Sequence, residues 1–164
     1  MPPPPATPFN PGGLRPCTAM AFAIAEARHA AQNGEVPVGA IILDSNGTAI
    51  ARASNRVETD HDPSAHAELL ALRAAARARR TTRLSDCTLV VTLEPCPMCA
   101  AAAVHFRIRR ILFGAYDPKG GGIDHGPRIF DQPACLHRPE VIGGIREQEN
   151  AHLLKAFFRS LRKN

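Results

Sequence analysis

The sequence lacks long apolar runs, and no stretch approaches the ~18 consecutive apolar residues of a membrane-spanning helix. It also lacks internal repeats, a second domain and the Gly-x-x-x-x-Gly-Lys-Ser/Thr spacing of a phosphate-binding loop. Hydrophobic residues make up 45% and charged residues 21% of the chain, which excludes the disordered class. A chain of 164 residues can bury one core without disulfides or a structural metal, so we expect one globular domain and no membrane partner.

The number of cysteines is odd, so they cannot all pair in disulfides within one chain. The five cysteines follow an N-terminal stretch without the basic-then-apolar layout of a signal peptide. This pattern favours a reduced, cytoplasmic location and a metal-binding or catalytic use of thiols over a disulfide framework. Only Cys96 and Cys99 have ligand spacing, and we expect Cys17, Cys87 and Cys135 to be small buried hydrophobic residues.

Lysine is scarce, because 17 of the 20 basic residues are arginine, and the net charge is +5 with a pI near 9.3. Arginine binds phosphate with its planar fork and stacks on bases. The charge is therefore compatible with a nucleic-acid partner, but by itself it does not establish one.

The order of elements is predicted by hydrophobic periodicity and turn residues. Residues 1–16 contain seven prolines and are expected to be a disordered Pro-rich tail, followed by a folded domain over residues 17–164. Helices are predicted over residues 18–33, 65–80, 100–104 and 147–163, with one short helix near 128–130. Strands are predicted over residues 36–43, 48–53, 88–93, 109–114 and 141–142. Alternating strands and helices indicate the α/β class, whose ligands bind at the carboxyl ends of the central strands.

Local signals refine three of these boundaries. Thr18 is a possible N-cap of the first helix, and Gly34 is its stop signal. Asn46-Gly47 between the first two strands indicates a hairpin. The segment Asp62-Pro63-Ser64 has the capping residue and proline that usually open a helix.

Two short motifs carry the chemistry, Pro63-Ser64-Ala65-His66-Ala67-Glu68 and Glu94-Pro95-Cys96-Pro97-Met98-Cys99. One histidine and a Cys-x-x-Cys pair are three ligands of the kind that hold Zn²⁺, and three ligands leave a tetrahedral ion one open position for water. Both motifs are expected at helix starts, where the positive end of the helix favours a thiolate. Taken singly, His66 could be a core histidine, Glu68 a helix-terminal carboxylate, and the cysteines a redox or structural pair. Together they form the known His-x-Glu and Pro-Cys-x-x-Cys signature of zinc-dependent nucleobase deaminases.

From about residue 20 to residue 162 the chain resembles the bacterial tRNA-specific adenosine deaminases, which have the cytidine deaminase-like fold. The zinc signature alone marks only the superfamily. The tRNA branch is indicated by the spaced set of matching segments 35–40, 54–56, 61–68, 92–99, 117–121 and 157–162.

The resemblance implies an α/β fold, a three-layer α/β/α sandwich around a five-stranded mixed sheet. It also implies a cytoplasmic homodimer that converts the wobble adenosine of an arginine tRNA to inosine. One Zn²⁺ per subunit would be bound by His66, Cys96 and Cys99, with Glu68 as the proton shuttle.

The resemblance also implies contacts with RNA. Asn55, which by itself would be a turn residue, would hydrogen-bond the inserted purine. The tRNA anticodon stem-loop would contact Asp117, Lys119, Phe158, Arg159 and Arg162. We expect Phe157, unlike Phe158, to be mostly a packing residue of the last helix.

The chain departs from the family in residues 121–136. Many members have Gly-Ser-Leu where this chain has Asp124-His125-Gly126, and many have Asn where this chain has Leu136. A polar RNA contact at Leu136 is therefore absent, and the loop could support a variant mode of recognition.

Two other functions stay open at this point. A deaminase of free guanine, cytosine, cytidine or adenosine would use the same zinc ligands without needing the basic end of the last helix. A non-catalytic nucleic-acid-binding module with structural zinc would need a fourth ligand. His61, Cys87 and His105 are the nominal candidates for that ligand.

Overall fold

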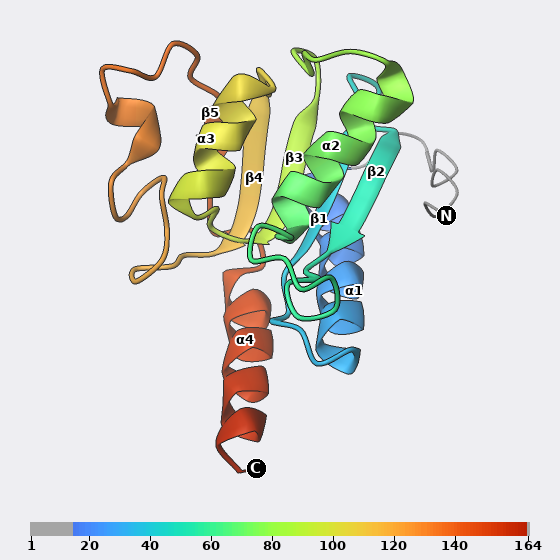
Figure 1. Cartoon of the computed structure of the whole chain (residues 1–164), viewed down its shortest axis with the longest axis vertical. Helices are drawn as coiled ribbons and strands as arrows, with labels where there is room; N and C mark the ends of the chain where they lie inside the picture. Colours follow the sequence, from blue (N-terminus) through green and yellow to red (C-terminus); the bar gives the residue numbers. More distant parts are fainter. Residues whose placement is uncertain (1–14, 164) are drawn as a thin grey trace.

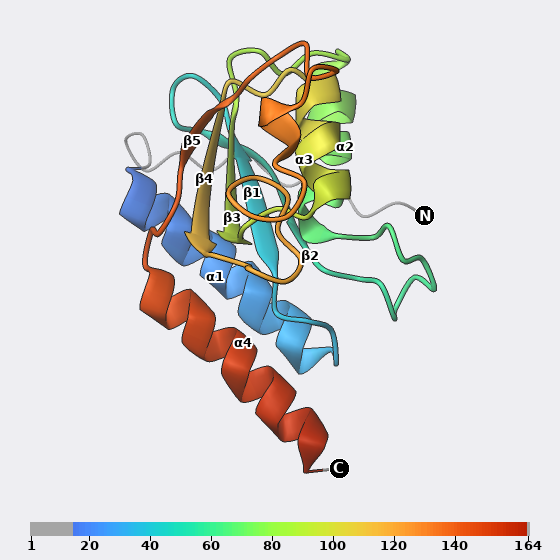
Figure 2. The same cartoon turned by 90° about the vertical axis from the view of Figure 1, so that its left-hand side faces the viewer.

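The computed structural model describes residues 15–163, which form one sheet between two layers of helices (Figures 1 and 2). The strands are β1 (Gly39–Leu43), β2 (Ala49–Ser54), β3 (Thr88–Leu93), β4 (Arg110–Ala115) and β5 (Glu140–Ile142). The helices are α1 (Pro16–Gln32), α2 (Ala67–Arg79), α3 (Pro97–His105) and α4 (Glu147–Arg162), with a short 3₁₀ helix at Ile129–Asp131. None of the described helices is long and apolar enough to cross a membrane.

The five strands lie in the order β2-β1-β3-β4-β5. β1 pairs antiparallel with both β2 and β3, whereas β3 pairs parallel with β4 and β4 pairs parallel with β5. The predicted hairpin and the mixed sandwich are therefore confirmed. Because β2, β3 and β4 run in the same direction, they end at one edge of the sheet, and the segments that lead to α2 and α3 leave from that edge.

The core lies on both faces of the sheet. Along β3, Leu89 and Val91 pack toward α2 and α3, whereas Val90 packs toward α1. This alternation follows from the two-residue period of a strand, and it explains why β3 is apolar at successive positions. Figure 2 shows α2 and α3 on one face and α1 and α4 on the other.

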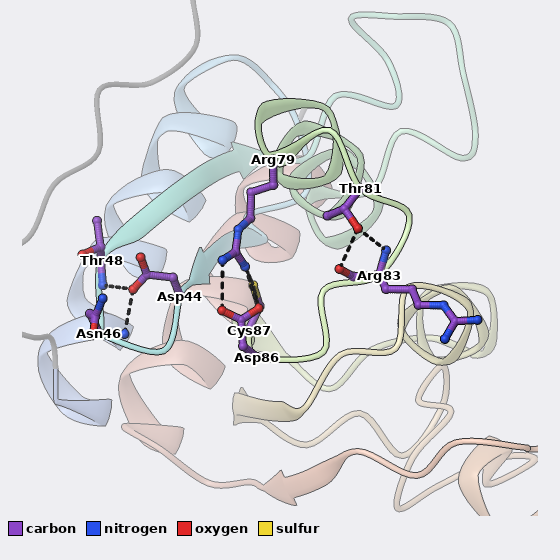
Figure 3. A network of polar contacts seen from close by, with 8 residues as sticks. All are labelled: Asp44, Asn46, Thr48, Arg79, Thr81, Arg83, Asp86 and Cys87. Atoms are coloured by element: carbon purple, nitrogen blue, oxygen red, sulfur yellow. Dashed lines mark hydrogen bonds and ion pairs between the residues drawn. The ribbon is translucent and has the colours of Figure 1, made fainter.

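The end of α2 is tied to the segment that leads into β3 (Figure 3). Arg79 donates two hydrogen bonds to the Asp86 carboxylate, at 2.6 and 3.0 Å, and a third to Cys87 Sγ at 3.1 Å. Both elements continue toward the opposite edge of the sheet, where the deaminase motifs lie. The ion pair therefore fixes the far ends of the two elements whose other ends belong to the site.

The start of α2 differs from the prediction. Asp62 and Ser64 do not cap the helix, because Asp62 Oδ1 accepts hydrogen bonds from Ser64 N at 2.8 Å and Ser64 Oγ at 2.7 Å, which close a separate turn. His66 is the N-cap residue, and its side chain makes no capping bond. The imidazole of His66 is therefore available for other ligands.

Three smaller predictions also need correction. Helix α1 begins at Pro16 and not at Thr18, since a proline is already favourable in the first turn. It therefore starts inside the predicted tail, of which residues 1–14 lie outside the described part. Cys17 is exposed and Cys135 is partly buried, so only Cys87 is buried as expected.

The predicted end of α1 is confirmed. Gly34 has a φ of +76°, as the stop signal of α1 requires.

The second half of α4 extends beyond the edge of the sheet (Figure 1). Phe158 is 43% exposed and Leu161 is 53% exposed, because no strand lies beneath them. Phe157 is half-buried against Phe158, with ring centroids 5.4 Å apart, and it does not belong to the core. Phe157 is thus more buried than Phe158, as expected, although it packs on Phe158 and not in the core of the sheet.

Candidate active site

Three candidate metal ligands meet between the starts of α2 and α3. His66 is the N-cap of α2, Cys96 is the N-cap of α3, and Cys99 lies in the first turn of α3. His66 Nδ1 lies 3.5 Å from Cys96 Sγ and 3.6 Å from Cys99 Sγ. All three ligand atoms lie within 4.8 Å of one another.

This donor set fits Zn²⁺. With Zn–S near 2.3 Å and Zn–N near 2.0–2.1 Å, nitrogen and sulfur at two corners of a tetrahedron are roughly 3.6 Å apart. The hydrogen bond that Cys96 Sγ shares with Cys99, together with the one that it shares with His66, lowers the pKa of the Cys96 thiol to about 4, although burial opposes this change. The site therefore favours the thiolate at Cys96, whereas the hydrogen bond to Cys96 and burial raise the pKa of the Cys99 thiol, which would lose its proton on binding the metal.

No fourth ligand completes the cluster among the described residues 15–163. His61 and His105 are exposed, and Cys87 precedes β3 at the opposite end of that strand. Structural zinc sites are usually closed by four protein ligands, whereas catalytic sites keep one position open. The three-ligand cluster is thus of the catalytic type.

Glu68 lies beside these ligands in the first turn of α2. Its Oε2 accepts a hydrogen bond from Cys99 Sγ at 3.6 Å, and only 4% of the residue is exposed. Burial raises the pKa of Glu68 to about 7. A buried carboxyl group in this position can accept a proton and return it.

The cluster opens into a pocket of about 550 Å³, a size typical of small-ligand sites. Asn55 directly follows β2 and lines this pocket together with His66 and Glu68. Its backbone N–H donates to Val38 O at 3.1 Å. Between residues 15 and 163 no hydrogen bond to its side-chain amide is seen, so the amide is free to bind a ligand.

A larger groove of about 1260 Å³ adjoins the pocket. Both are lined by Asp117 and Phe158, and the pocket also reaches Phe157. Basic side chains line the groove at Lys119, Lys155, Arg159, Arg162 and Lys163. The structure thus places all the predicted RNA-contacting residues around two connected cavities, and their roles stay predictions.

Asp117 also organises its own loop. Its Oδ1 accepts hydrogen bonds from Lys119 N at 3.2 Å and Gly120 N at 2.9 Å. One carboxylate oxygen is therefore engaged within the loop, which leaves Oδ2 as the atom for an external donor.

Two buried carboxylates near the pocket were not identified from the sequence. Glu35 and Glu94 are each 1% exposed, and their oxygens accept hydrogen bonds from loops that line the pocket. Burial raises the pKa of each carboxyl group, but the hydrogen bonds outweigh burial, and both pKa values lie below the ordinary value. The matching motifs contained both residues, but no local signal identified their partners.

Comparisons with known proteins agree with this geometry. Residues 15–115 match the family model for the cytidine and deoxycytidylate deaminase zinc-binding region. The chain is 48% identical to a tRNA-specific adenosine deaminase of Agrobacterium fabrum, over 87% of this chain and 93% of the relative.

Solved structures give the same result. One solved structure, from work on A-to-I editing by tRNA:A34 deaminases, is 47% identical to this chain and has a TM-score of 0.81. The match covers 83% of this chain and 98% of the other. A guanine deaminase from Nitrosomonas europaea is 26% identical, with a TM-score of 0.76, over 93% of this chain and 88% of the other. The chain belongs to the bacterial tRNA-specific adenosine deaminases, within the family defined by the cytidine and deoxycytidylate deaminase zinc-binding region.

Proposed function

We propose that this protein converts the wobble adenosine, position 34, of an arginine tRNA anticodon to inosine by hydrolytic deamination. The observation that carries this proposal is the placement of Glu68 beside a three-ligand metal cluster, in a pocket that opens into a basic groove. The pocket has the size for one inserted base, and the groove has the charge for the strand that carries it. Membership of the family supports the choice of substrate.

The chemistry needs a water molecule and a group that moves its protons. Zn²⁺ bound by His66, Cys96 and Cys99 would supply a Lewis acid that lets water lose a proton near neutral pH. Glu68 accepts that proton and delivers it to N1 of adenine as the water oxygen adds to C6. Glu68 then takes the remaining proton of the added hydroxyl and gives it to the departing amine. Ammonia leaves, and the base becomes hypoxanthine.

The pocket would bind the target base, and the groove would bind the neighbouring nucleotides of the RNA. Asn55 holds the inserted purine through its free side-chain amide. An anticodon loop is single stranded, so its bases can turn outward and stack on the rings of Phe157 and Phe158. Lys119, Arg159 and Arg162 neutralise phosphates, which makes binding depend on salt concentration.

A deaminase of free guanine is the second candidate, because the Nitrosomonas europaea guanine deaminase shares the fold. The basic groove favours RNA, because a free base carries no phosphate for five cationic side chains to bind. For the assembly, we propose a homodimer that acts in the cytoplasm on tRNA, as the resemblance implies.

The decisive experiment compares substrates. Purified zinc-loaded protein is incubated with an arginine-tRNA anticodon stem-loop and, separately, with adenosine, guanine and cytidine, and inosine and ammonia are measured. We expect inosine from the stem-loop at a kcat/KM at least about 100-fold higher than for free adenosine, since RNA contacts contribute to transition-state binding.

The matched control is the same stem-loop with guanosine at position 34, which should release no ammonia. Product from the free compounds alone would overturn the proposal.

A further inference from the structure

The pocket has two walls that are loops and not regular elements. Val57 and Glu58 belong to the loop of residues 56–62, which forms one wall. Asp117 and Gly120 belong to the loop of residues 117–125, which forms the other. Each loop has short-range backbone hydrogen bonds of its own, such as Asp60 N to Arg56 O at 2.9 Å and Gly121 N to Asp117 O at 2.9 Å. These bonds close turns within a loop, so the attachment of each loop to the rest of the fold needs other contacts.

Glu35 holds the first wall. Its carboxylate accepts hydrogen bonds from Glu58 N at 3.0 Å, Thr59 N at 2.8 Å and Thr59 Oγ1 at 2.7 Å. The residue lies between α1 and β1 and is 1% exposed. The 56–62 loop is therefore tied through its backbone to the segment between α1 and β1.

Glu94 holds the second wall with more bonds. Oε1 accepts from Asp117 N at 3.1 Å and His125 Nδ1 at 2.8 Å. Oε2 accepts from Ile123 N at 3.2 Å, Asp124 N at 3.1 Å and His125 N at 3.1 Å. Glu94 is one of the residues that line the pocket, but its side chain has no exposed surface and its two oxygens are engaged by the loop.

The close approach of this loop depends on glycine. A Cβ atom on Gly121 would clash with Glu94 Oε2, and one on Gly122 would lie within 2.8 Å of the backbone of Cys96 and Pro97. Gly122 N also donates to Pro95 O at 2.8 Å. The 117–125 loop is thus packed directly on the segment that carries the metal-ligand cysteines.

The two anchors have the same chemistry. Each is a buried carboxylate in the segment that joins a helix and a strand, and each binds several donors of a loop that lines the pocket. Hydrogen bonds to a buried ionised group are stronger than those between neutral groups. Most of the donors are backbone N–H groups, and the side chains of Thr59 and His125 add one donor each.

We propose that Glu35 and Glu94 are positioning residues for substrate binding, each setting the shape of one wall of the pocket through the hydrogen bonds that its carboxylate accepts from a loop. The expected change in KM rests on the proposed RNA deaminase function, whereas the expected change in loop mobility does not. Glu94 acts on the loop that carries Asp117 and Lys119, and Glu35 acts on the loop that carries Val57 and Glu58.

The test is a pair of matched variants, Glu35→Gln and Glu94→Gln, with Glu147→Gln on the exposed start of α4 as the control for the same chemical change. Amide hydrogen exchange is measured by mass spectrometry on the zinc-loaded proteins. We expect Glu94→Gln to raise the exchange rate of amides in residues 117–125 at least about tenfold and to leave that of residues 56–62 unchanged. A tenfold rise corresponds to the loss of at least one charge-assisted hydrogen bond. Glu35→Gln should give the reverse pattern.

Kinetics with the anticodon stem-loop supply the second readout. We expect each variant to retain its zinc and to raise KM about tenfold while kcat stays within about threefold, because the loops bind substrate and do not react with it. Unchanged exchange in both variants, equal loosening of both loops in each variant, or a fall in kcat at unchanged KM would overturn the proposal.

A milder variant keeps the test decisive if Glu94→Gln does not fold. His125→Ala removes one donor of the Glu94 cluster from a partly exposed position. It should raise exchange in the same loop by a smaller factor, and an unchanged loop would count against the proposal. If the stem-loop were not a substrate at all, the proposed function would fail, while the exchange results would still decide the role of the two carboxylates.

Discussion

Glu68 owes its place in the site to the first turn of α2. The N-cap position of His66 sends the imidazole toward the cysteines, and Glu68, two residues later, lies against Cys99. Two groups with different tasks are thus placed by one helix start. The separation of these tasks can be tested by changing one residue.

We expect Glu68→Ala to bind zinc normally and to lose about 10²- to 10⁴-fold in turnover, the usual contribution of a general acid-base group. Metal analysis and single-turnover inosine formation on the stem-loop measure the two properties. Glu147→Ala, a change on an exposed side chain at the start of α4, serves as the comparison and should keep most of the turnover. Near-normal turnover in Glu68→Ala would refute the assigned role.

The sequence predicted the metal cluster because its members lie in two short motifs with ligand spacing. Cys96 and Cys99 are three positions apart, and His66 and Glu68 are two apart, so local pattern is informative. The anchors Glu35 and Glu94 have donors 23 to 31 positions away. No local pattern can identify a carboxylate whose partners are set only by the tertiary fold.

At the scale of elements, helix ends are where prediction and structure differ most. Pro63 and the Asp62 side chain form a turn of their own, so the start signal of α2 acts a few residues before the helix. The end of α2 is also unusual, because Arg80 has φ of 51° and ψ of 45°, a left-handed conformation that favours glycine. Between residues 15 and 163 no hydrogen bond or ion pair of the Arg80 side chain is described.

We therefore expect Arg80→Gly to stabilise the protein by about 0.5–1 kcal/mol, because glycine removes the steric cost of the left-handed conformation. Urea denaturation of the two proteins gives the difference in free energy of unfolding. Arg77→Gly, one turn earlier inside the helix, should instead destabilise by about 1 kcal/mol. If both variants shifted the free energy in the same direction, the explanation by backbone conformation would be wrong.

At the scale of the whole molecule, the sandwich and its sheet follow from alternation of strands and helices together with the family resemblance. The projection of α4 beyond the sheet could not be read from the sequence. Its apolar positions, such as Leu154 and Leu161, have the spacing of a buried face whether or not a strand lies beneath them. Periodicity predicts which face of a helix is apolar, but it does not predict which element packs against that face.

The core of the sheet involves none of the candidate ligands except Cys99 at its margin, so the metal should be needed for activity and not for the fold. We expect removal of zinc with a chelator to abolish inosine formation and to leave the far-ultraviolet circular dichroism spectrum unchanged. Reloading with Zn²⁺ should restore activity, and Mg²⁺, which prefers oxygen ligands, should not. Loss of secondary structure on chelation would show that the metal is structural.

The strand order also has a consequence for the geometry of the metal site. His66 follows β2 and Cys96 follows β3, yet β1 lies between these two strands and pairs with both. The distance between the histidine and the cysteines therefore depends on the pairing of β1 with each neighbour. A substitution in β1 that shifts either pairing would move metal ligands that lie on neither face of β1 itself.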